Sequence, residues 1–530
     1  MTGGSMLRYF MMVVGFLLVL PAASVNAAEK TQLTIDASQG GAIINRNIFG
    51  QFAEHLGHGI YGGIWVGADS SIPNTRGIRN DVVAALKAIK VPNVRWPGGC
   101  FADNYHWRNG IGAHRAVTLN PDWGGVTEPN TFGTHEFMDF AEQVGASPYV
   151  SVNVGSGTPH EAADWLEYMT SALPTTLAKE RAANGHPAPY KVPFLGIGNE
   201  SWDCGGNMSP EYYLSQFKIY SRFVRNFNPE EQGNNSMLKI AVGPGGEGPR
   251  WTEWAETIMK GYKDHSWSWD MNGLSMHNYT VINWKDKYKS VGFGETEYAQ
   301  ILQETLKMND LINTYSAIMD KYDSEKKVAL VVDEWGGWYA PYPPDSNPGF
   351  LMQQNSMRDA VLAALNINIF ARHAARVRMA NIAQMINVLQ AMILTDNEKM
   401  VLTPTYYVYK MYVPFQDATF VPVNYDAGKY THDGITLPRV DAIAARGTDG
   451  KLWLSVTNID PDQPADVQLS LSGIHATRAM GETLTAAKVD SINTFDAPNT
   501  VVPHSFTAKV KGNTVELKLQ PKSVTVVSIE

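Results

Sequence analysis

Two glutamates follow apolar segments at distant points of the chain. Glu200 comes after the run VPFLGIG with Asn199 directly before it, and Glu334 stands near the end of VALVVDEWG. Hydrolysis of a glycosidic bond needs such a pair, because one carboxylic acid protonates the leaving oxygen while the other carboxylate attacks or stabilises the anomeric carbon. A lone glutamate after a strand is more often a helix cap or an ion-pair partner. The catalytic hypothesis for Glu200 therefore depends on the presence of the second glutamate, Glu334.

Eight short apolar segments between residues 45 and 395 predict the strands that position these glutamates. They are NIFGQFAEH, VPNVRWPGG, SPYVSVNVG, VPFLGIGNE, KIAVGPGG, GLSMHNYT, VALVVDEWG and RVRMANIAQ. The stretches between them, such as RNDVVAALKAIK, have apolar residues at helical spacing. This alternation predicts a (β/α)8 barrel. The alternative is a doubly wound open sheet, which usually binds a nucleotide at a glycine-rich turn, but GPGGEG at Gly243 to Gly248 does not match that fingerprint.

In such a barrel, side chains at the carboxyl ends of the strands face one shared opening. The polar residues at these positions are Glu54, Arg95, Asn199, Glu200, His277, Tyr279, Glu334 and Gln384. Arg95 beside Glu334 would favour the ionised form that a nucleophile needs. His277 and Tyr279 face the same side because they stand two residues apart on one strand, so both can donate hydrogen bonds to a carboxylate or a sugar.

Metal and cofactor sites are not predicted. The nearest metal-like motif is EHLGH, where His55 and His58 lack a convincing third ligand and are better explained by local hydrogen bonds. Three tryptophans follow the same strand ends: Trp123, Trp335 and Trp338. Each of them taken singly is a packing residue more often than a ligand. As a group around one opening, we expect at least one to stack against a sugar.

A second domain is predicted after residue 396, where helical spacing disappears. The segments KLWLSVTNI, ADVQLSLSGI, TVELKLQ and KSVTVVSIE alternate like strands between turn residues and predict a β-sandwich over residues 396–530. TQLTIDAS, within residues 28–44, is also strand-like, and we expect it to pair with that sheet rather than with the barrel.

The N-terminus predicts export. Residues 1–27 have an arginine, an apolar run from Tyr9 to Leu20 and small residues up to Ala27, which is typical of a signal peptide and predicts a periplasmic or extracellular protein. The run is too short for a membrane span, and no later segment is long enough. The net charge of −9 excludes a basic surface for nucleic acid or an anionic membrane. The two cysteines, Cys100 and Cys204, leave one disulfide and two free thiols as alternatives.

A series of motifs resembles a known family. In chain order the motifs are GQFAEHLG, VRWPGGCFADNYHWRNGIG, FGTHEFMDF, GTPHEAADWLEY, GIGNESWDCGGNMSPEYY, MHNYT, DEWGGWY, ANIAQMINVLQAMI and TPTYYVYKMYVPFQDA. They closely resemble the α-L-arabinofuranosidases of glycoside hydrolase family 51, over about residues 45 to 420. The sequence departs from the family at His135 and, on either side of the shared Trp202, at Ser201 and Asp203. Asp203 leaves the preference for the leaving group open.

The resemblance implies an exo-acting, retaining enzyme that needs no cofactor. Glu200 takes the family's acid/base position and Glu334 its nucleophile position. The resemblance places the remaining site residues as follows: sugar contacts at Glu54, Cys100, Asn199 and Gln384, an orienting residue at Tyr279, aromatic pocket positions at Trp123 and Trp338, and a supporting shell at Arg95 and His277. It implies arabinan, arabinoxylan or arabino-oligosaccharides as substrates, and homo-oligomers are frequent among relatives.

Two other functions remain open at this point. An endoglucanase or xylan-cleaving enzyme can share the fold and the carboxylate pair, because neither determines the sugar. A deep pocket favours removal of one terminal furanose, whereas a long open groove favours cleavage within a chain. A non-catalytic carbohydrate-binding protein belongs to a different class, and the presence of both Glu200 and Glu334 argues against it.

Overall fold

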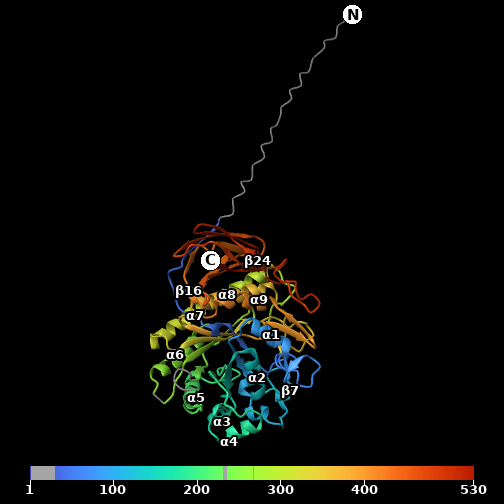
Figure 1. Ribbon diagram of the computed structural model, residues 1–530, viewed down its shortest axis with the longest axis vertical. Coiled ribbons are helices and arrows are strands. Elements are labelled where there is room, and N and C mark those ends of the chain that lie inside the picture. Colours follow the sequence, from blue (N-terminus) through green and yellow to red (C-terminus); the bar gives the residue numbers. More distant parts are fainter. Residues whose placement is uncertain (2–29, 231–235, 267) are drawn as a thin grey trace.

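The computed structural model describes Met1 and residues 30–230, 236–266 and 268–530. It consists of a closed parallel barrel surrounded by helices and a β-sandwich at one end of the molecule (Figure 1). The predicted (β/α)8 barrel with a C-terminal all-β domain is confirmed. The predicted signal peptide, residues 1–27, lies outside the described residues except for Met1. In the described ranges, no helix has both the length and the apolar character needed to span a membrane.

The barrel wall contains all eight segments that the sequence predicts as its strands. They are β2 (Gly50–Phe52), β5 (Asn93–Trp96), β8 (Ser147–Val152), β9 (Phe194–Ile197), β10 (Leu238–Ala241), β11 (Gly273–Thr280), β12 (Ala329–Gly337) and β13 (Val377–Ile382). Each strand pairs in parallel with the next, and β13 pairs with β2 to close the ring. Helices cover the outside and side chains fill the inside, so these short apolar strands are buried on both faces.

Helices follow the strands and cover the barrel. They are α1 (Asn80–Ala88), α2 (Thr134–Val144), α3 (Pro159–Thr170), α4 (Thr176–Ala183), α5 (Pro210–Phe223), α6 (Pro249–Lys263), α7 (Glu295–Tyr322), α8 (Met357–Arg372) and α9 (Pro404–Met411). Short 3₁₀ helices are η1 (Arg46–Phe49), η2 (Cys100–Asp103), η3 (Trp107–Gly110), η5 (Pro348–Phe350) and η6 (Val413–Phe415).

The helix α9 differs from the prediction that helical spacing ends at residue 396. It follows β13 and packs against α8, so it serves as the helix of the eighth βα unit. Nearly all its residues are buried, and the hydroxyl of Tyr406 donates a hydrogen bond to the carbonyl of Ala85. A short helix buried on every side has no polar face, and for this reason its sequence lacks an amphipathic pattern.

The C-terminal domain is a sandwich of two sheets. The five-stranded sheet has the order β17 (Val423–Tyr425), β1 (Thr31–Asp36), β22 (Ala465–Ser472), β26 (Thr514–Leu519) and β25 (Lys509–Lys511). The six-stranded sheet has the order β16 (Thr419–Val421), β20 (Val440–Arg446), β21 (Leu452–Asn458), β27 (Ser523–Ile529), β23 (Ala479–Leu484) and β24 (His504–Thr507). The N-terminal strand β1 thus lies between two strands of the C-terminal domain.

Four hairpins complete the strands in the described part of the chain. They are β3 (Asn74–Thr75) with β4 (Ile78–Arg79), β6 (Thr118–Asn120) with β7 (Val126–Glu128), β14 (Ile393–Asp396) with β15 (Lys399–Leu402), and β18 (Lys429–His432) with β19 (Ile435–Pro438).

The six-stranded sheet joins the two domains. Along β20, Ala442 and Ala444 pack into the core of the sandwich, whereas Ile443 and Ala445 pack into the core of the barrel. Successive side chains of a strand point to opposite faces, so one strand serves both cores. Polar contacts reinforce this junction, because Asp441 accepts hydrogen bonds from Asn368 (2.7 Å) and Arg372 (2.9 Å) of α8. The barrel therefore has a large apolar contact with the sandwich.

Candidate active site

The two glutamates meet at the carboxyl ends of their strands. Glu200 directly follows β9 through Gly198 and Asn199, and Glu334 lies in β12. Nδ1 of His277, on β11, lies 2.8 Å from Oε1 of Glu200 and 3.5 Å from Oε2 of Glu334. One ligand atom from each of these three side chains lies within 4.8 Å of the other two. The fold therefore brings the two carboxyl groups together around one imidazole.

Both oxygens of Glu334 are held by hydrogen bonds. Arg95 donates to Oε1 at 2.7 Å, and the hydroxyl of Tyr279 donates to Oε2 at 2.7 Å. Arg95 also donates to Oδ1 of Asn199 at 2.6 Å, so a single guanidinium links the nucleophile candidate with the residue beside Glu200. Arg95 is buried, because β5 places it in the barrel interior behind the carboxylates.

A third carboxylate, Asp333, lies behind the pair. It accepts a hydrogen bond from Tyr149 (2.7 Å) and pairs with Nε2 of His277 (3.1 Å) and with Arg95. The sequence interpretation missed this residue, because strict alternation along a strand would turn Asp333 away from the face of Glu334. The pairing register of β12 shifts between Val332 and Trp335, and both acids reach the interior.

Burial and neighbouring charges separate the proton affinities in this cluster. Burial raises the pKa of Glu200, and the hydrogen bond from His277 lowers it. The charge of Glu334 raises it again, so the pKa of Glu200 lies above its ordinary value. Burial alone would lower the pKa of His277, but Glu334, Asp333 and Glu200 outweigh it and raise that pKa to about 10. Burial would raise the pKa of Asp333, but Arg95 and His277 hold it below its ordinary range. His277 is therefore an imidazolium at neutral pH.

The inner end of the site is built around Glu54. Its Oε1 accepts hydrogen bonds from the backbone N–H of Phe101 (3.0 Å) and from Trp123 (2.9 Å), and its Oε2 accepts one from Gln384 (2.9 Å). Burial and the charge of Glu334 outweigh these bonds and raise the pKa of Glu54 to about 7. Oε1 of Gln384 is buried and has no hydrogen-bond partner among the described residues. This end of the site thus has a free acceptor for a ligand hydroxyl.

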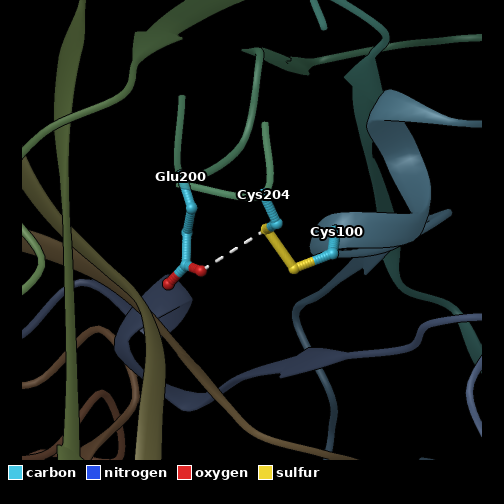
Figure 2. Close-up of side chains that lie close together, drawn as sticks. All are labelled: Cys100, Glu200 and Cys204. Carbon is cyan, nitrogen blue, oxygen red and sulfur yellow. Dashed lines mark hydrogen bonds between the residues drawn. A yellow bond between two sulfur atoms is a disulfide. The ribbon is translucent and has the colours of Figure 1, made fainter. Parts of the chain in front are cut away.

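Cys100 and Cys204 form a disulfide next to Glu200 (Figure 2). The structure thereby decides between the two alternatives that the sequence leaves open. The bond joins the start of η2, after β5, to the turn after β9, and Sγ of Cys204 lies 3.7 Å from Oε2 of Glu200. A disulfide has no S–H proton, so any sugar contact at Cys100 involves a sulfur acceptor or the backbone.

Asp103, also missed by the sequence interpretation, ties together the same loops. Its carboxylate accepts hydrogen bonds from the backbone N–H groups of Val154 (2.8 Å), Gly155 (2.8 Å) and Asn199 (3.2 Å). Burial outweighs these bonds and raises its pKa to about 7. The position of Asp103 in the motif CFADN, after a predicted strand end, could have marked it as a site residue. The sequence does not show which loops its carboxylate contacts.

A cavity of about 610 Å³ opens at this cluster. The predicted site residues that line it are Glu54, Cys100, Trp123, Asn199, Glu200, His277, Tyr279, Glu334, Trp338 and Gln384. Arg95 supports the cavity from behind. Trp335 does not reach it, because its side chain is fully buried and packs edge-on against Phe370 of α8. Of the three tryptophans in the sequence hypothesis, Trp123 and Trp338 thus remain as pocket residues.

The side chains that could ligate a metal are otherwise engaged. His55 uses both ring nitrogens within the protein, Nδ1 with Glu128 (3.0 Å) and Nε2 as acceptor from Trp96 (3.1 Å). Two other groups are close enough to share an ion: Cys100 with Glu200 and Cys204, and Glu200 with His277 and Glu334. The sulfurs of the first group are joined in a disulfide, and both ring nitrogens of His277 in the second already face carboxylates, Nδ1 facing Glu200 and Nε2 facing Asp333. The donor set therefore suits proton transfer better than metal binding.

Family models and a curated relative agree on the class of protein. A model of the α-L-arabinofuranosidase 1 domain matches residues 85–244, and one of the α-L-arabinofuranosidase C-terminal domain matches residues 333–523. A protein from Bacteroides ovatus, named an intracellular exo-α-L-arabinofuranosidase, is 44% identical over 96% of this chain and 97% of its own.

This relative contradicts the predicted localisation. Since it is intracellular by name, the prediction of a periplasmic or extracellular enzyme is wrong. That prediction depended on the apolar run within residues 1–27. The hydropathy of a short run measures affinity for an apolar phase and does not establish that the segment is recognised for export.

Solved structures show the same fold at high identity. The family 51 arabinofuranosidase from Xanthomonas axonopodis pv. citri is 50% identical, with a TM-score of 0.91 over 94% of this chain and all of its own. The α-L-arabinofuranosidase from Thermotoga maritima, in an arabinose complex, is 30% identical, with a TM-score of 0.79 over the same shares. Because relatives at 44% and 50% identity match nearly the whole chain, and family models match both its halves, the chain belongs to the α-L-arabinofuranosidases of glycoside hydrolase family 51.

Proposed function

We propose that this protein is an exo-acting, retaining α-L-arabinofuranosidase in which Glu334 is the nucleophile and Glu200 the acid/base. The observation that carries the proposal is the approach of the two carboxyl groups, with one oxygen of each within 4.8 Å of the other. Retaining glycosidases hold their carboxyl groups about 5–5.5 Å apart, whereas inverting enzymes leave roughly 6.5–9.5 Å for a water molecule. Carboxyl oxygens this close together favour the retaining arrangement.

In the first step, Glu334 attacks the anomeric carbon and the bond from that carbon to the glycosidic oxygen breaks. Glu200 gives its proton to the departing oxygen, and an arabinosyl ester of Glu334 forms. Arg95 and Tyr279 orient the nucleophile through its two oxygens, so neither oxygen needs to reorganise before the attack. The protonated form of Glu200 is favoured because burial and the charge of Glu334 raise its pKa.

In the second step, Glu200 accepts a proton from water, and the resulting hydroxide equivalent attacks the anomeric carbon and releases Glu334. The ester has no negative charge, so one cause of the raised pKa of Glu200 is absent in the intermediate. Nδ1 of His277 lies 2.8 Å from Oε1 of Glu200 and can donate a hydrogen bond to its carboxylate at this stage. The same residue can therefore act first as acid and then as base.

The proposed sugar contacts are Glu54, Cys100, Asn199, Tyr279 and Gln384, with Trp123 and Trp338 as aromatic walls. Glu54 has remaining lone pairs on oxygens that already accept three hydrogen bonds, and Gln384 adds an unpartnered buried oxygen. These acceptors suit the hydroxyl groups of one furanose. The amide N–H₂ of Asn199 has two donors. One is directed at Sγ of Cys204 (3.8 Å), and the other can donate to the 2-hydroxyl, where hydrogen bonds strengthen as positive charge develops on the ring.

Exo action is supported by the shape of the cavity. Its inner end is closed by Glu54 and Gln384, so a chain cannot continue beyond the sugar that lies there. The Bacteroides ovatus relative is also named an exo enzyme. Arabinan, arabinoxylan and arabino-oligosaccharides carry such terminal units and are the proposed substrates. Assembly into homo-oligomers stays a prediction, which light scattering can test.

Two measurements test this function. NMR of the reaction on 4-nitrophenyl α-L-arabinofuranoside should detect α-arabinose as the first anomer, whereas β-arabinose would contradict retention. The Glu334→Ala variant should lose roughly 10³-fold or more in kcat, because no covalent intermediate can form. Added azide should restore turnover of this variant and yield the β-azide. The matched control is Glu253→Ala, an exposed glutamate on α6, which should keep wild-type rates.

A further inference from the structure

The cavity extends well beyond the residues that would hold one furanose. It has a volume of about 610 Å³, within the range of roughly 300–1,000 Å³ that encloses drug-sized ligands and far more than a five-carbon sugar fills. Outside the proposed sugar contacts, the cavity is also lined by Trp251, by Trp284 and by three residues of α7 (Glu304, Lys307 and Leu311). None of these takes part in the steps derived above.

Exposure increases outward along a chain of aromatic contacts. Glu334 is 5% exposed and bonds to Tyr279, whose ring lies 4.9 Å from that of Trp338, which in turn lies 5.3 Å from the ring of Trp284. Trp284 is 56% exposed. Glu200, which protonates the leaving oxygen, has a more exposed side chain than Glu334, 17% against 6%. The leaving group of an exo enzyme must therefore point outward, toward the mouth where Trp284 stands.

Trp284 is held in place although it is exposed. Of the tryptophans in the described ranges, it alone is more than a third exposed. Trp338 packs against it edge to face, and the ammonium group of Lys287 lies over both rings, 5.7 Å from Trp284 and 5.3 Å from Trp338. A fixed indole at the mouth of a sugar site offers an apolar face to the C–H groups of a sugar ring. Stacking of a sugar ring would explain why so large an apolar side chain is exposed to solvent.

We propose that Trp284 is the aromatic platform of a leaving-group subsite that binds a sugar ring of the oligosaccharide beyond the scissile bond. The inference rests on the exo cleavage proposed above, since it assigns the leaving group to the open end. Glu304, Lys307 and Leu311 stand on one face of α7 and continue the cavity. Glu304 and Lys307 pair with each other at 2.7 Å and offer polar groups to sugar hydroxyls, whereas Leu311 adds an apolar contact. Trp284 and this face of α7 together predict that affinity rises when the leaving group is a sugar chain.

The test compares two substrates that differ in their leaving group. Methyl α-L-arabinofuranoside has no ring to stack on Trp284, whereas α-1,5-linked arabinotriose has a chain. For Trp284→Ala, the ratio of kcat/KM for arabinotriose to that for the methyl glycoside should fall roughly 3- to 10-fold, mainly through KM, as expected for loss of one aromatic contact. Trp284→Phe, which keeps a ring, should recover most of the ratio. Tyr212→Ala, equally exposed at 56% on α5 and outside the cavity, should leave the ratio unchanged.

The outcomes separate this inference from the proposed function. If the wild-type enzyme cleaves neither substrate, both proposals fail. If it cleaves both and Trp284→Ala leaves the ratio at the wild-type value, only the platform is disproved. The platform is also disproved if Trp284→Ala changes the molar mass measured by light scattering but leaves the ratio of the two kcat/KM values unchanged. Trp284 would then be covered by another copy of the chain. The platform is supported if the ratio falls in Trp284→Ala and is largely recovered in Trp284→Phe.

Discussion

Glu200 adopts a backbone conformation that few residues other than glycine tolerate. Its φ is 38°, in the left-handed region, which costs of order 1–3 kcal/mol. The turn is held by the disulfide of Cys204 and by the hydrogen bond from the N–H of Asn199 to Asp103. This conformation brings the Glu200 carboxylate to His277 and Glu334, so the surrounding contacts stabilise a strained residue at the site where its position decides the chemistry.

In the proposed mechanism, the positive charge of His277 adjusts the pKa of the acid/base, Glu200. Its hydrogen bond lowers the pKa of Glu200, although burial keeps that pKa above its ordinary value overall. For His277→Gln we expect the pKa of Glu200 to rise, because a neutral amide stabilises the carboxylate less than an imidazolium. Activity requires a protonated Glu200, so the basic limb of the kcat/KM profile should move to higher pH. Measuring kcat/KM of His277→Gln on methyl α-L-arabinofuranoside as a function of pH checks this prediction. A basic limb that stays in place or moves to lower pH would contradict the role assigned to His277.

Glu54 should make stability depend on pH. Its pKa is about 7 in the folded protein against an ordinary value of 4.5, so folding is favoured while the carboxyl group is protonated. The stabilisation is fully present below pH 4.5 and is lost as pH rises through 7, on the order of 3 kcal/mol in all. In Glu54→Gln, the decrease in the free energy of unfolding from pH 4.5 to 8 should be smaller than in wild type.

Denaturant titrations at several pH values measure this difference. The Glu54→Gln variant should keep part of the decrease, because Asp103 also has its pKa raised to about 7. The exposed Glu211→Gln on α5 serves as control and should follow the wild-type curve. If Glu54→Gln follows it too, the carboxylate of Glu54 ionises without penalty.

At the scale of elements, the disulfide connects the loop after β5 with the turn after β9. Cys100 and Cys204 are separated by 104 positions, and a loop of this size gives a large entropic contribution in the chain-entropy description. For the double variant Cys100→Ser with Cys204→Ser, we expect a loss of roughly 2–4 kcal/mol in the free energy of unfolding. KM should rise as well, because the turn that carries Asn199 and Glu200 loses a restraint.

Thermal unfolding with and without a thiol reductant checks this prediction. The reductant should lower the Tm of wild type toward that of the double variant and should not affect the variant. An unchanged Tm in both cases would mean that hydrogen bonds to Asp103 alone hold these loops.

For the whole molecule, Asp441 couples the two domains. It lies on β20 of the sandwich and accepts hydrogen bonds from Asn368 and Arg372 of the barrel helix α8, as well as from Tyr425 (3.1 Å). None of these residues lines the catalytic cavity. Asp441→Ala leaves their donors without an acceptor and should lower the free energy of unfolding by about 2–3 kcal/mol, less than for a fully buried pair because Arg372 is partly exposed.

Calorimetry and steady-state kinetics together test this coupling. The Asp441→Ala variant should unfold at a lower temperature while kcat and KM at 25 °C stay at wild-type values. Asp496→Ala, whose side chain is 95% exposed, is the control and should not change the Tm. If Asp441→Ala had the same Tm as wild type, apolar packing alone would stabilise the contact between the barrel and the sandwich.

Local sequence patterns were enough to predict the barrel strands and the polar residues at their ends, including Glu200, Glu334, Arg95 and Gln384. Both follow from local patterns, since an apolar run followed by a polar residue marks a strand end whatever lies elsewhere in the chain. The resemblance to family 51 depended on such local motifs as well, and the comparisons confirmed it.

Which strand-end residues touch, and in which direction their side chains point, became clear from the folded chain alone. It turned Asp333 toward the interior through a register shift, turned Trp335 away, closed the bond between Cys100 and Cys204, and placed Trp284 at the open end of the cavity. The physical reason is that contacts between residues far apart in the chain depend on strand register, barrel closure and rotamers. No local pattern of residue types encodes these distances.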